Sequence, residues 1–270
     1  MPEPKPRRAH LIAGGFPPGS MGGHDHDYAR LNLLGLLAER EVPSSVSNDF
    51  ADVEKWLPVS RFLVTYVAGP YPDTAQTQAI ADWLDAGGRW LALHGTSGGR
   101  AQRVEGVRMR RTVKTEHHAV LGGFFLTHPP IREFRVDVAA PDSPLTAGLG
   151  ASFTVEDEPY FVELTDPAAT QILLTAEYGP SAAGATAGLY ERDTSLLADG
   201  KTRAIGYTRK VGKGAVTYYT LGHCHNPAIR AARANNDPAD ATPPTFRGPW
   251  ENEAVGRLLR NAVLWGIEAA

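Results

Sequence analysis

The first hundred residues alternate between short apolar runs and segments with helical spacing, and this alternation constrains the fold more than any other feature. Apolar runs occupy Ala9–Gly15, Arg61–Gly69 and Arg89–Gly95. Between them, apolar residues recur at helical spacing over about Asp27–Glu39 and from Asp73 or Thr74 to the glycines at 87–88. Strands joined through helices by short connections run parallel, so the pattern predicts βαβ units in an open, doubly wound α/β sheet.

The second half of the chain is richer in strand signals than in helical ones. A glycine-containing turn at Val211–Ala215 predicts a hairpin between the last two strands. A final amphipathic helix over Asn252–Ala269 is expected to pack on the sheet. Additional strands, which extend the mostly parallel sheet, are expected at Ile131–Ala139, Ala151–Leu164, Gln171–Glu177, Thr202–Lys210 and Gly214–Gly222.

No repeat or linker divides the sequence, and 270 residues with 42% hydrophobic content can bury one large core. We therefore expect a single domain over residues 1–270, with an N-terminal tail at 1–8. The segment 226–250 is rich in Pro, Ala and Asn, which predicts a long loop.

Composition excludes several classes of protein. The net charge is −3 and the basic run at Lys5–Arg8 is short, so neither nucleic acid nor an anionic membrane is expected as a partner. The single cysteine, Cys224, excludes an internal disulfide and fits a reducing compartment. No apolar run approaches the roughly 18 residues of a membrane span, and the N-terminus lacks a signal-peptide pattern. We expect a cytoplasmic protein.

Histidine is the unusual residue type in this chain. Ligands of doubly wound sheets bind beyond the carboxyl ends of the strands, where the predicted fold places several of the histidines. One of them, His94, occupies the corner at which other α/β enzymes carry a Ser or Cys nucleophile. Imidazoles together with the carboxylates of Glu156–Glu158 suit zinc, manganese or iron. Eight of the nine histidines gather in four places: His24 and His26; His94; His117, His118 and His128; and His223 and His225.

Each of these residues also has an ordinary structural interpretation. A histidine of this kind can be a solvated loop residue or a hydrogen-bonded partner in the crevice. His117 and His118 are expected to be structural, and His225 to be exposed. The acidic segment Glu156–Glu158 can be a charged strand end.

Other catalytic motifs are missing. The glycine-rich segment 14–23 lacks both the dinucleotide fingerprint and the Lys-Ser/Thr of a P-loop, so no nucleotide cofactor is expected. No G-x-S-x-G motif occurs, and Thr96 and Ser97 lie near the corner without occupying it. Cys224 adjoins His223, but neighbours on an extended chain point apart, so a Cys-dependent hydrolase is not favoured.

Six segments, in order over nearly the whole chain, carry motifs of one known family. They are His24–Tyr28, Leu91–Gly99, Leu121–Pro130, Val155–Phe161, Val211–His225 and Arg257–Glu268. In this order they resemble the ThuA-like (trehalose-utilisation) family, whose fold is similar to that of class I glutamine amidotransferases and is flavodoxin-like. A Trp common before the glycine hairpin is missing and the segment 226–250 is long, so substrate specificity is expected to differ.

The resemblance implies an enzyme of trehalose-like or keto-sugar catabolism, a hydrolase, lyase or isomerase, with a small sugar as substrate. His94 holds the position of the amidotransferase Cys, so glutamine hydrolysis through a thiolate is not expected. Two mechanisms stay open: a divalent metal that polarises the sugar, or His94 as general base without a metal. The alternative function is a non-catalytic sugar- or partner-binding protein, and a homo-oligomer is compatible with either. The candidate residues are His94, Asp157 and Glu158 for catalysis; Tyr160, Thr96 and Trp250 for substrate; and His24, His26, His128 and His223 for the metal.

Overall fold

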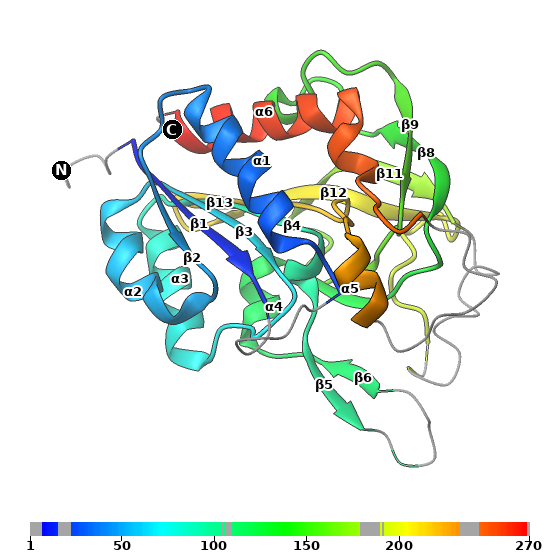
Figure 1. Ribbon diagram of the computed structural model, residues 1–270, viewed down its shortest axis with the longest axis horizontal. Helices are drawn as coiled ribbons and strands as arrows, with labels where there is room; N and C mark the ends of the chain where they lie inside the picture. The colour runs from blue at the N-terminus through cyan, green and yellow to red at the C-terminus, as the bar shows by residue number, and fades with distance from the viewer. Residues whose placement is uncertain are drawn as a thin grey trace.

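The computed structural model describes residues 7–15, 23–103, 105, 110–178, 190, 192–232 and 243–268. These residues form a nine-stranded sheet with helices on both faces, together with two smaller two-stranded sheets (Figure 1). In spatial order the strands of the large sheet are β2 (Ser44–Ser47), β1 (Ala9–Gly14), β3 (Phe62–Val67), β4 (Arg89–Leu93), β13 (Gly214–Tyr219), β12 (Thr202–Val211), β11 (Thr170–Glu177), β8 (Arg132–Val138) and β9 (Ser152–Asp157).

The first five strands of this order, from β2 to β13, pair in parallel. Every residue of β1 and β3 is buried, as expected for strands that helices cover on both faces. The doubly wound α/β sheet predicted from the sequence is confirmed.

From β13 onward the remaining neighbours pair antiparallel. The predicted hairpin between β12 and β13 is present, with Val211 opposite Gly214. Because four antiparallel pairs separate β13 from β9, β9 points in the same direction as the parallel strands. Its carboxyl end at Asp157 therefore lies at the edge where the parallel strands also end.

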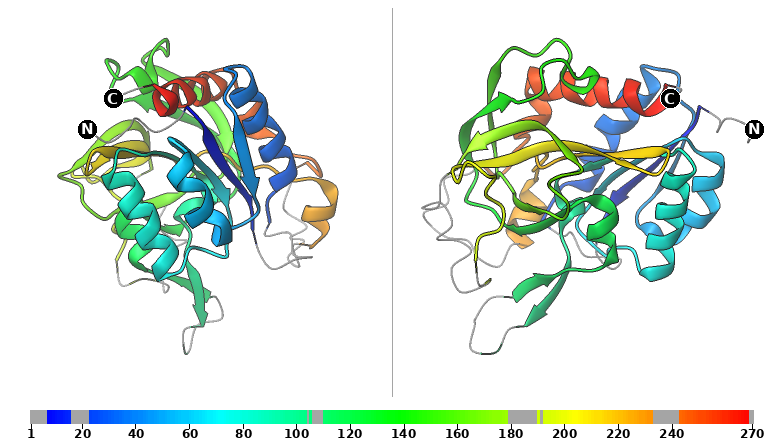
Figure 2. Two further views of the ribbon diagram at one scale, coloured as in Figure 1. Left: turned by 90° about the vertical axis from the view of Figure 1, so that its left-hand side faces the viewer. Right: turned by 180° about the vertical axis from the view of Figure 1, so that it is seen from behind.

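Helices cover both faces of the sheet, as the two further views show (Figure 2). On one face, α1 (His26–Ala38) and α6 (Glu253–Ile267) contribute Leu33, Leu37, Leu258 and Val263 to a core with β1, β3 and β4. The other face carries α2 (Val53–Trp56), α3 (Thr74–Asp85) and α4 (Glu116–Leu121), together with a second core. The described residues also include the short helices η1 (Phe50–Asp52), η2 (Leu57–Val59), η3 (His94–Ser97), η4 (Pro144–Thr146), α5 (Pro227–Ala232) and η6 (Gly248–Glu251).

The two ends of helix α3 have the capping residues that allowed them to be predicted from the sequence. Asp73 accepts from the backbone N–H of Gln76 at 2.8 Å, and the Gln76 side chain accepts from the N–H of Asp73, which completes a capping box. The helix ends before Gly87, whose φ of 100° is left-handed and favours glycine.

Two small sheets lie beside the large one. Strands β7 (Gly123–Thr127) and β10 (Phe161–Leu164) form an antiparallel ribbon. Strands β5 (Arg100–Arg103) and β6 (Arg110–Val113) form a hairpin that projects from the body of the molecule (Figures 1 and 2). The predicted strand over 151–164 is thus two strands, β9 and β10, separated by Glu158–Tyr160.

Parts of two predicted segments lie outside the described residues, namely 1–6 of the N-terminal tail and 233–242 of the long loop. The described parts of 226–250 contain α5 and most of η6, and Phe246 pairs with His225 in an isolated bridge. No helix among the described residues combines the length and apolar character that crossing a membrane requires.

Candidate metal centre

Four buried side chains meet at the carboxyl edge of the parallel strands. His94 directly follows β4, and His223 lies four residues after β13. His24 precedes α1, and Glu158 is the first residue after β9. Their ring nitrogens and one carboxylate oxygen all lie within 4.8 Å of one another. The fold therefore brings together residues that are 64 or more positions apart in the sequence.

The distances centre on one oxygen of Glu158. Its Oε1 is 2.9 Å from His223 Nδ1, 3.3 Å from His94 Nε2 and 3.7 Å from His24 Nε2. The two Nε2 atoms of His24 and His94 are 3.0 Å apart. Glu158, His94 and His223 are at most 2% exposed, and His24 is 7% exposed.

The backbone at His94 is unusual. Its φ is +44°, a left-handed conformation that non-glycine residues rarely adopt and that clusters at functional sites. A Cβ on the next residue, Gly95, would lie 2.3 Å from the Val67 carbonyl oxygen, so the turn requires glycine there. This tight corner directs the His94 ring into the centre rather than along the sheet.

The hydrogen bonds of His94 fix its tautomer. Its Nδ1 lies 2.7 Å from the carbonyl oxygen of Thr220, and a carbonyl can only accept, so Nδ1 carries the hydrogen. Burial lowers the pKa of His94 to about 4, which keeps the ring neutral at pH 7. The lone pair of Nε2 therefore points toward His24 and Glu158.

His223 is oriented in the same way through a second histidine. His225 Nε2 lies 2.9 Å from the Pro243 carbonyl oxygen and therefore donates to it. A neutral His225 then accepts at Nδ1 from His223 Nε2, 3.0 Å away. Burial lowers the pKa of His223 to about 3, so its Nδ1 presents a lone pair. This Nδ1 makes no hydrogen bond of good geometry among the described residues, although Glu158 Oε1 is close.

Glu158 supplies the negative charge of the centre. Burial by itself would raise the pKa of its carboxyl, but the His128 ring beside its second oxygen holds that pKa well below its usual range. Two ring lone pairs thus converge on an ionised carboxylate, an arrangement that a cation would stabilise. Three imidazoles and one carboxylate are a donor set that fits zinc, manganese or iron.

Asp157 points away from this cluster. Its carboxylate accepts from the backbone N–H groups of Gly222 at 2.8 Å, His223 at 3.1 Å and Glu158 at 2.8 Å. It is fully buried, and burial raises the pKa of its carboxyl well above the usual value. The structure therefore gives Asp157, predicted as an acid/base residue, a place behind the ligands, where it fixes the backbone of two of them.

The second oxygen of Glu158 faces a less buried region. His128 Nδ1 is 3.5 Å from Glu158 Oε2, and the His128 side chain is 36% exposed. The Tyr160 ring lies 4.0 Å from the His94 ring and 5.5 Å from the His128 ring. The Tyr160 ring therefore packs beside both His94 and His128, while Glu158 is in direct reach of His128.

Three other predicted residues lie outside the cluster. His26 is the first residue of α1, and its ring centre is 6.0 Å from that of His24. Thr96 is fully buried inside η3 and bonds to the Thr65 carbonyl oxygen at 3.1 Å. Trp250 donates from Nε1 to the Gly222 carbonyl oxygen at 2.8 Å.

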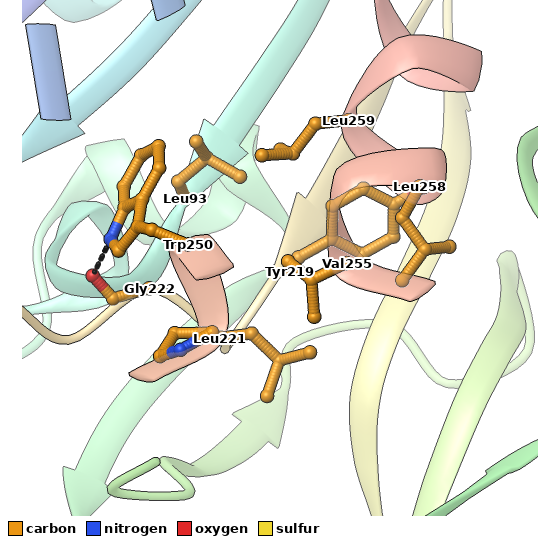
Figure 3. A pocket seen from close by; sticks show the side chains of 9 residues that line it. Leu93, Tyr219, Leu221, Gly222, Trp250, Val255, Leu258 and Leu259 are labelled. Atoms are coloured by element: carbon orange, nitrogen blue, oxygen red, sulfur yellow. Dashed lines mark hydrogen bonds between the residues drawn. The ribbon is translucent and has the colours of Figure 1, made fainter. Parts of the chain in front are cut away.

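Trp250 borders a small apolar cavity against α6, and the dashed line in Figure 3 marks its bond to Gly222. The cavity measures about 10 Å³, close to the space of one water molecule and far below that of a sugar. Leu93, Tyr219, Val255 and Leu258 also line it. In this position Trp250 supports the backbone beneath His223.

The remaining histidines of the corner are structural, as the sequence predicted for His117 and His118. Their Nε2 atoms lie 2.9 Å from the carbonyl oxygens of Thr96 and Gly98, respectively, and donate to them. The prediction that His225 is exposed is wrong, since it is 2% exposed and orients His223. Cys224 is also buried, and burial raises the pKa of its thiol to about 12, which removes thiolate character.

Comparison with known proteins identifies the family. The sequence profile of the ThuA family, described as trehalose utilisation, matches residues 22–234. The chain belongs to the ThuA family. The predicted resemblance is confirmed, and the family's involvement in trehalose utilisation is consistent with a sugar-related role. No curated protein matches the chain.

Solved structures agree on the fold. A ThuA-like protein from Parabacteroides merdae superposes with a TM-score of 0.58 at 15% identity, covering 97% of this chain and 90% of its own. One from Bacteroides uniformis gives 0.56 at 18% identity, with 83% and 86% covered. A β-galactosidase from Rahnella sp. R3 gives 0.51 at 12% identity over 80% of this chain and 29% of its own. At these identities the similarity concerns the fold alone.

Proposed function

We propose that this ThuA protein is a carbohydrate-processing enzyme whose reaction takes place at the centre of His24, His94, Glu158 and His223. We further propose that this centre holds a divalent zinc, manganese or iron ion. The observation that carries the proposal is the convergence of buried ring lone pairs on an ionised, buried carboxylate. The family's link to trehalose utilisation supports a sugar as the substrate.

His94 Nε2, His223 Nδ1, Glu158 Oε1 and His24 would hold the ion. When bound, it would act as a Lewis acid on a carbonyl or hydroxyl oxygen of the sugar. The hydrogen bond from His94 Nδ1 to Thr220 and the relay from His223 through His225 would orient the ligand rings. Partners of this kind contribute to metal affinity in other metal sites.

Proton transfer would fall to the side of the centre that solvent reaches. His128 is partly exposed and lies beside Glu158 Oε2, so its ring is the group placed to accept a proton there. With a keto sugar, the base would remove a proton from the carbon next to the carbonyl, and the electron pair would move to the carbonyl oxygen. This step is common to isomerases and lyases.

The mechanism in which His94 is itself the general base receives less support. Burial lowers the pKa of His94 to about 4, which makes it a weak base at neutral pH. The ring is also fully buried, whereas His128 is not. A ligand role suits His94 better than a base role.

Elemental analysis by mass spectrometry tests the metal centre. We expect about one equivalent of metal in the native protein and a loss of most of it in His223→Ala and His24→Ala. His26→Ala is the matched control, because His26 lies two residues from His24 but outside the ligand group, and it should retain the metal. Absence of metal in the native protein, even after incubation with excess ions, would contradict a metal centre.

Turnover distinguishes an enzyme from a binding protein. With a keto-disaccharide as substrate, His94→Ala should lower kcat by at least about 100-fold while the fold is retained. If the variant and the native protein bind the sugar and neither turns it over, the non-catalytic alternative is correct.

A further inference from the structure

A second cavity, separate from the metal centre, lies at the base of the projecting hairpin. Its volume of about 360 Å³ is within the range of small-molecule pockets, roughly 300–1,000 Å³. Residues of β6, β7 and β10 contribute to it, together with Tyr190, Arg192 and Thr194. The lining includes Arg111, Thr112, Lys114, Phe124, Glu163, Tyr190, Arg192 and Thr194.

The charges of this pocket favour an anion. Both carboxylate oxygens of Glu163 are occupied, one by the ammonium of Lys114 and the other by the hydroxyl of Thr194. Arg111 and Arg192 also line the pocket and are exposed, and neither forms an ion pair with another described residue. Among the described residues, neither guanidinium group has a paired carboxylate, and guanidinium binds phosphate or carboxylate in a bidentate manner.

The surrounding sequence strengthens this positive character. Residues 100–114 hold six of the chain's 27 Lys and Arg residues but only one of its 30 Asp and Glu residues. The N-terminal run at Lys5–Arg8 is thus not the only basic segment, although the net charge of the chain is −3. An anion near the hairpin meets a local field opposite in sign to that of the whole protein.

The remaining wall suits a polyhydroxylated ligand. Thr112 Oγ1 donates to the Phe125 carbonyl oxygen at 3.0 Å and accepts from the Tyr190 hydroxyl, 2.6 Å away. The Tyr190 oxygen therefore keeps its capacity to accept a hydrogen bond. The Phe124 ring, which is 2% exposed and meets the Tyr190 ring edge to face, forms an apolar base beneath these hydroxyl groups.

The β7–β10 ribbon separates this pocket from the metal centre. Phe124 lines the pocket, whereas the next residue, Phe125, has its ring 4.3 Å from that of Tyr160. Alternate side chains of β7 thus serve the two sites on opposite faces. A ligand in the pocket does not touch the four residues of the metal centre.

We propose that this pocket binds a small anionic carbohydrate, a sugar that carries a phosphate or carboxylate group. Arg111 and Arg192 bind the anionic group, and Tyr190 and Thr194 lie beside the sugar hydroxyls. The site is additional to the metal centre and does not depend on the proposed reaction.

Isothermal titration calorimetry on the full chain at low salt tests the proposal with four probes. Glucose 6-phosphate and glucuronate represent the two sources of negative charge, glucose tests the sugar alone, and inorganic phosphate tests the anion alone. We expect at least one of the two charged sugars to bind with a Kd below about 1 mM, and glucose and phosphate to bind at least about tenfold more weakly.

Three variants sharpen the test. Arg111→Gln and Arg192→Gln should each weaken binding of the charged sugar by about tenfold or more, because each removes a charge-assisted contact. Glu163→Gln should strengthen binding, because it removes the one negative charge among the described lining residues. Arg257→Gln, the same substitution at an exposed position of α6, is the control and should leave binding unchanged.

Three outcomes would overturn the proposal. The first is no binding of either charged sugar at 10 mM, about tenfold above the expected limit. The second is equal affinity for inorganic phosphate, which would indicate an adventitious anion site. The third is unchanged affinity in both arginine variants. Metal content, measured on the same samples, should be native in all variants, so failure here is distinguishable from failure of the metal centre.

Discussion

Two pairs of buried histidines lie at the same corner of the molecule and differ in what their second ring nitrogen meets. In His94 and His223, one nitrogen is hydrogen-bonded to a carbonyl or to His225, and the other faces Glu158. In His118, Nε2 donates to Gly98 and Nδ1 accepts from Thr115, so both nitrogens are bonded to the backbone. Burial and a lowered pKa are common to both pairs. Only the position of a carboxylate distinguishes a candidate ligand from a structural ring.

His117 is the clearest counterpart of His223. Its Nε2 donates to Thr96, and its Nδ1 has no hydrogen-bond partner among the described residues. Around it lie the rings of Phe50, Tyr71 and Trp90 rather than a carboxylate. An unpaired ring nitrogen is therefore insufficient to indicate a metal site.

The largest effect is expected when Glu158 loses its charge, because the carboxylate is what distinguishes the candidate ligands from the structural histidines. Glu158→Gln keeps the size of the side chain but removes the only carboxylate of the ligand group, so metal affinity should fall by at least about 100-fold. Elemental analysis after dialysis measures the loss. Glu156→Gln, a change at an exposed neighbour on β9, should retain native metal content. Equal metal content in the two variants would contradict the assignment of Glu158.

A smaller effect is expected at the residue that orients His223. His225→Ala removes the acceptor for His223 Nε2, so metal affinity should fall by about 10- to 100-fold without loss of the ligand itself. Competition with a chelator of known affinity measures this change. His225→Gln, which can still accept a hydrogen bond, should recover part of it. No difference between the Ala variant and the native protein would remove His225 from the metal centre.

On the structural side, His117 should control the acid stability of the fold. Burial lowers its pKa from 6.5 to about 3, so the unfolded chain takes up a proton below pH 6.5 that the folded chain refuses until about pH 3. The stability from neutral His117 is complete above pH 6.5 and is lost as the pH falls through that window. At pH 5 the free energy of unfolding is lower by about 2 kcal/mol because of this group.

His117→Gln, which can still donate to the Thr96 carbonyl, removes the titration. Denaturant unfolding gives the free energy of unfolding at pH 7 and at pH 5. The decrease in this free energy from pH 7 to pH 5 should be about 2 kcal/mol smaller in the variant than in the native protein. An unchanged difference would show that other groups cause the acid sensitivity.

The smallest effect is expected at Trp250. The Gly222 carbonyl accepts from both Trp250 Nε1 and the Tyr66 hydroxyl, each at 2.8 Å, so loss of one donor leaves the other. Trp250→Phe should cost about 1 kcal/mol of unfolding free energy and leave sugar binding unchanged. A large increase in KM would instead restore Trp250 as a substrate contact.

The parallel half of the fold and two of its site residues were predictable because the signals were local. Apolar runs and glycine ends located β1, β3 and β4, and the position of His94 and His223 after strands placed them at one edge. Choosing Glu158 rather than Asp157 was not possible from the sequence. The strand ends between them, so the alternation of side chains no longer decides which carboxylate faces the histidines.

His225 and Thr96 show two other limits. His225 was expected to be exposed, but the left-handed turn at Gly222 and the bridge to Phe246 bury it. The bridge joins residues 21 positions apart in the sequence, a pairing that local sequence patterns do not predict. Thr96 lies within the tight turn after His94, where its hydroxyl satisfies a buried carbonyl instead of facing the site. The sequence located the turn but not the direction of its side chains.

The spread of the four candidate ligands along the chain has a consequence for folding. Residues 24, 94, 158 and 223 belong to the first helix unit, the middle of the parallel sheet, the outer strand and the last hairpin. A chain that has folded only its first half lacks two of them. An ion held by all four would bind the native state and no partly folded one, so it would shift the folding equilibrium by mass action. Occupancy of the centre would thus report that the whole sheet, and not only its parallel half, has formed.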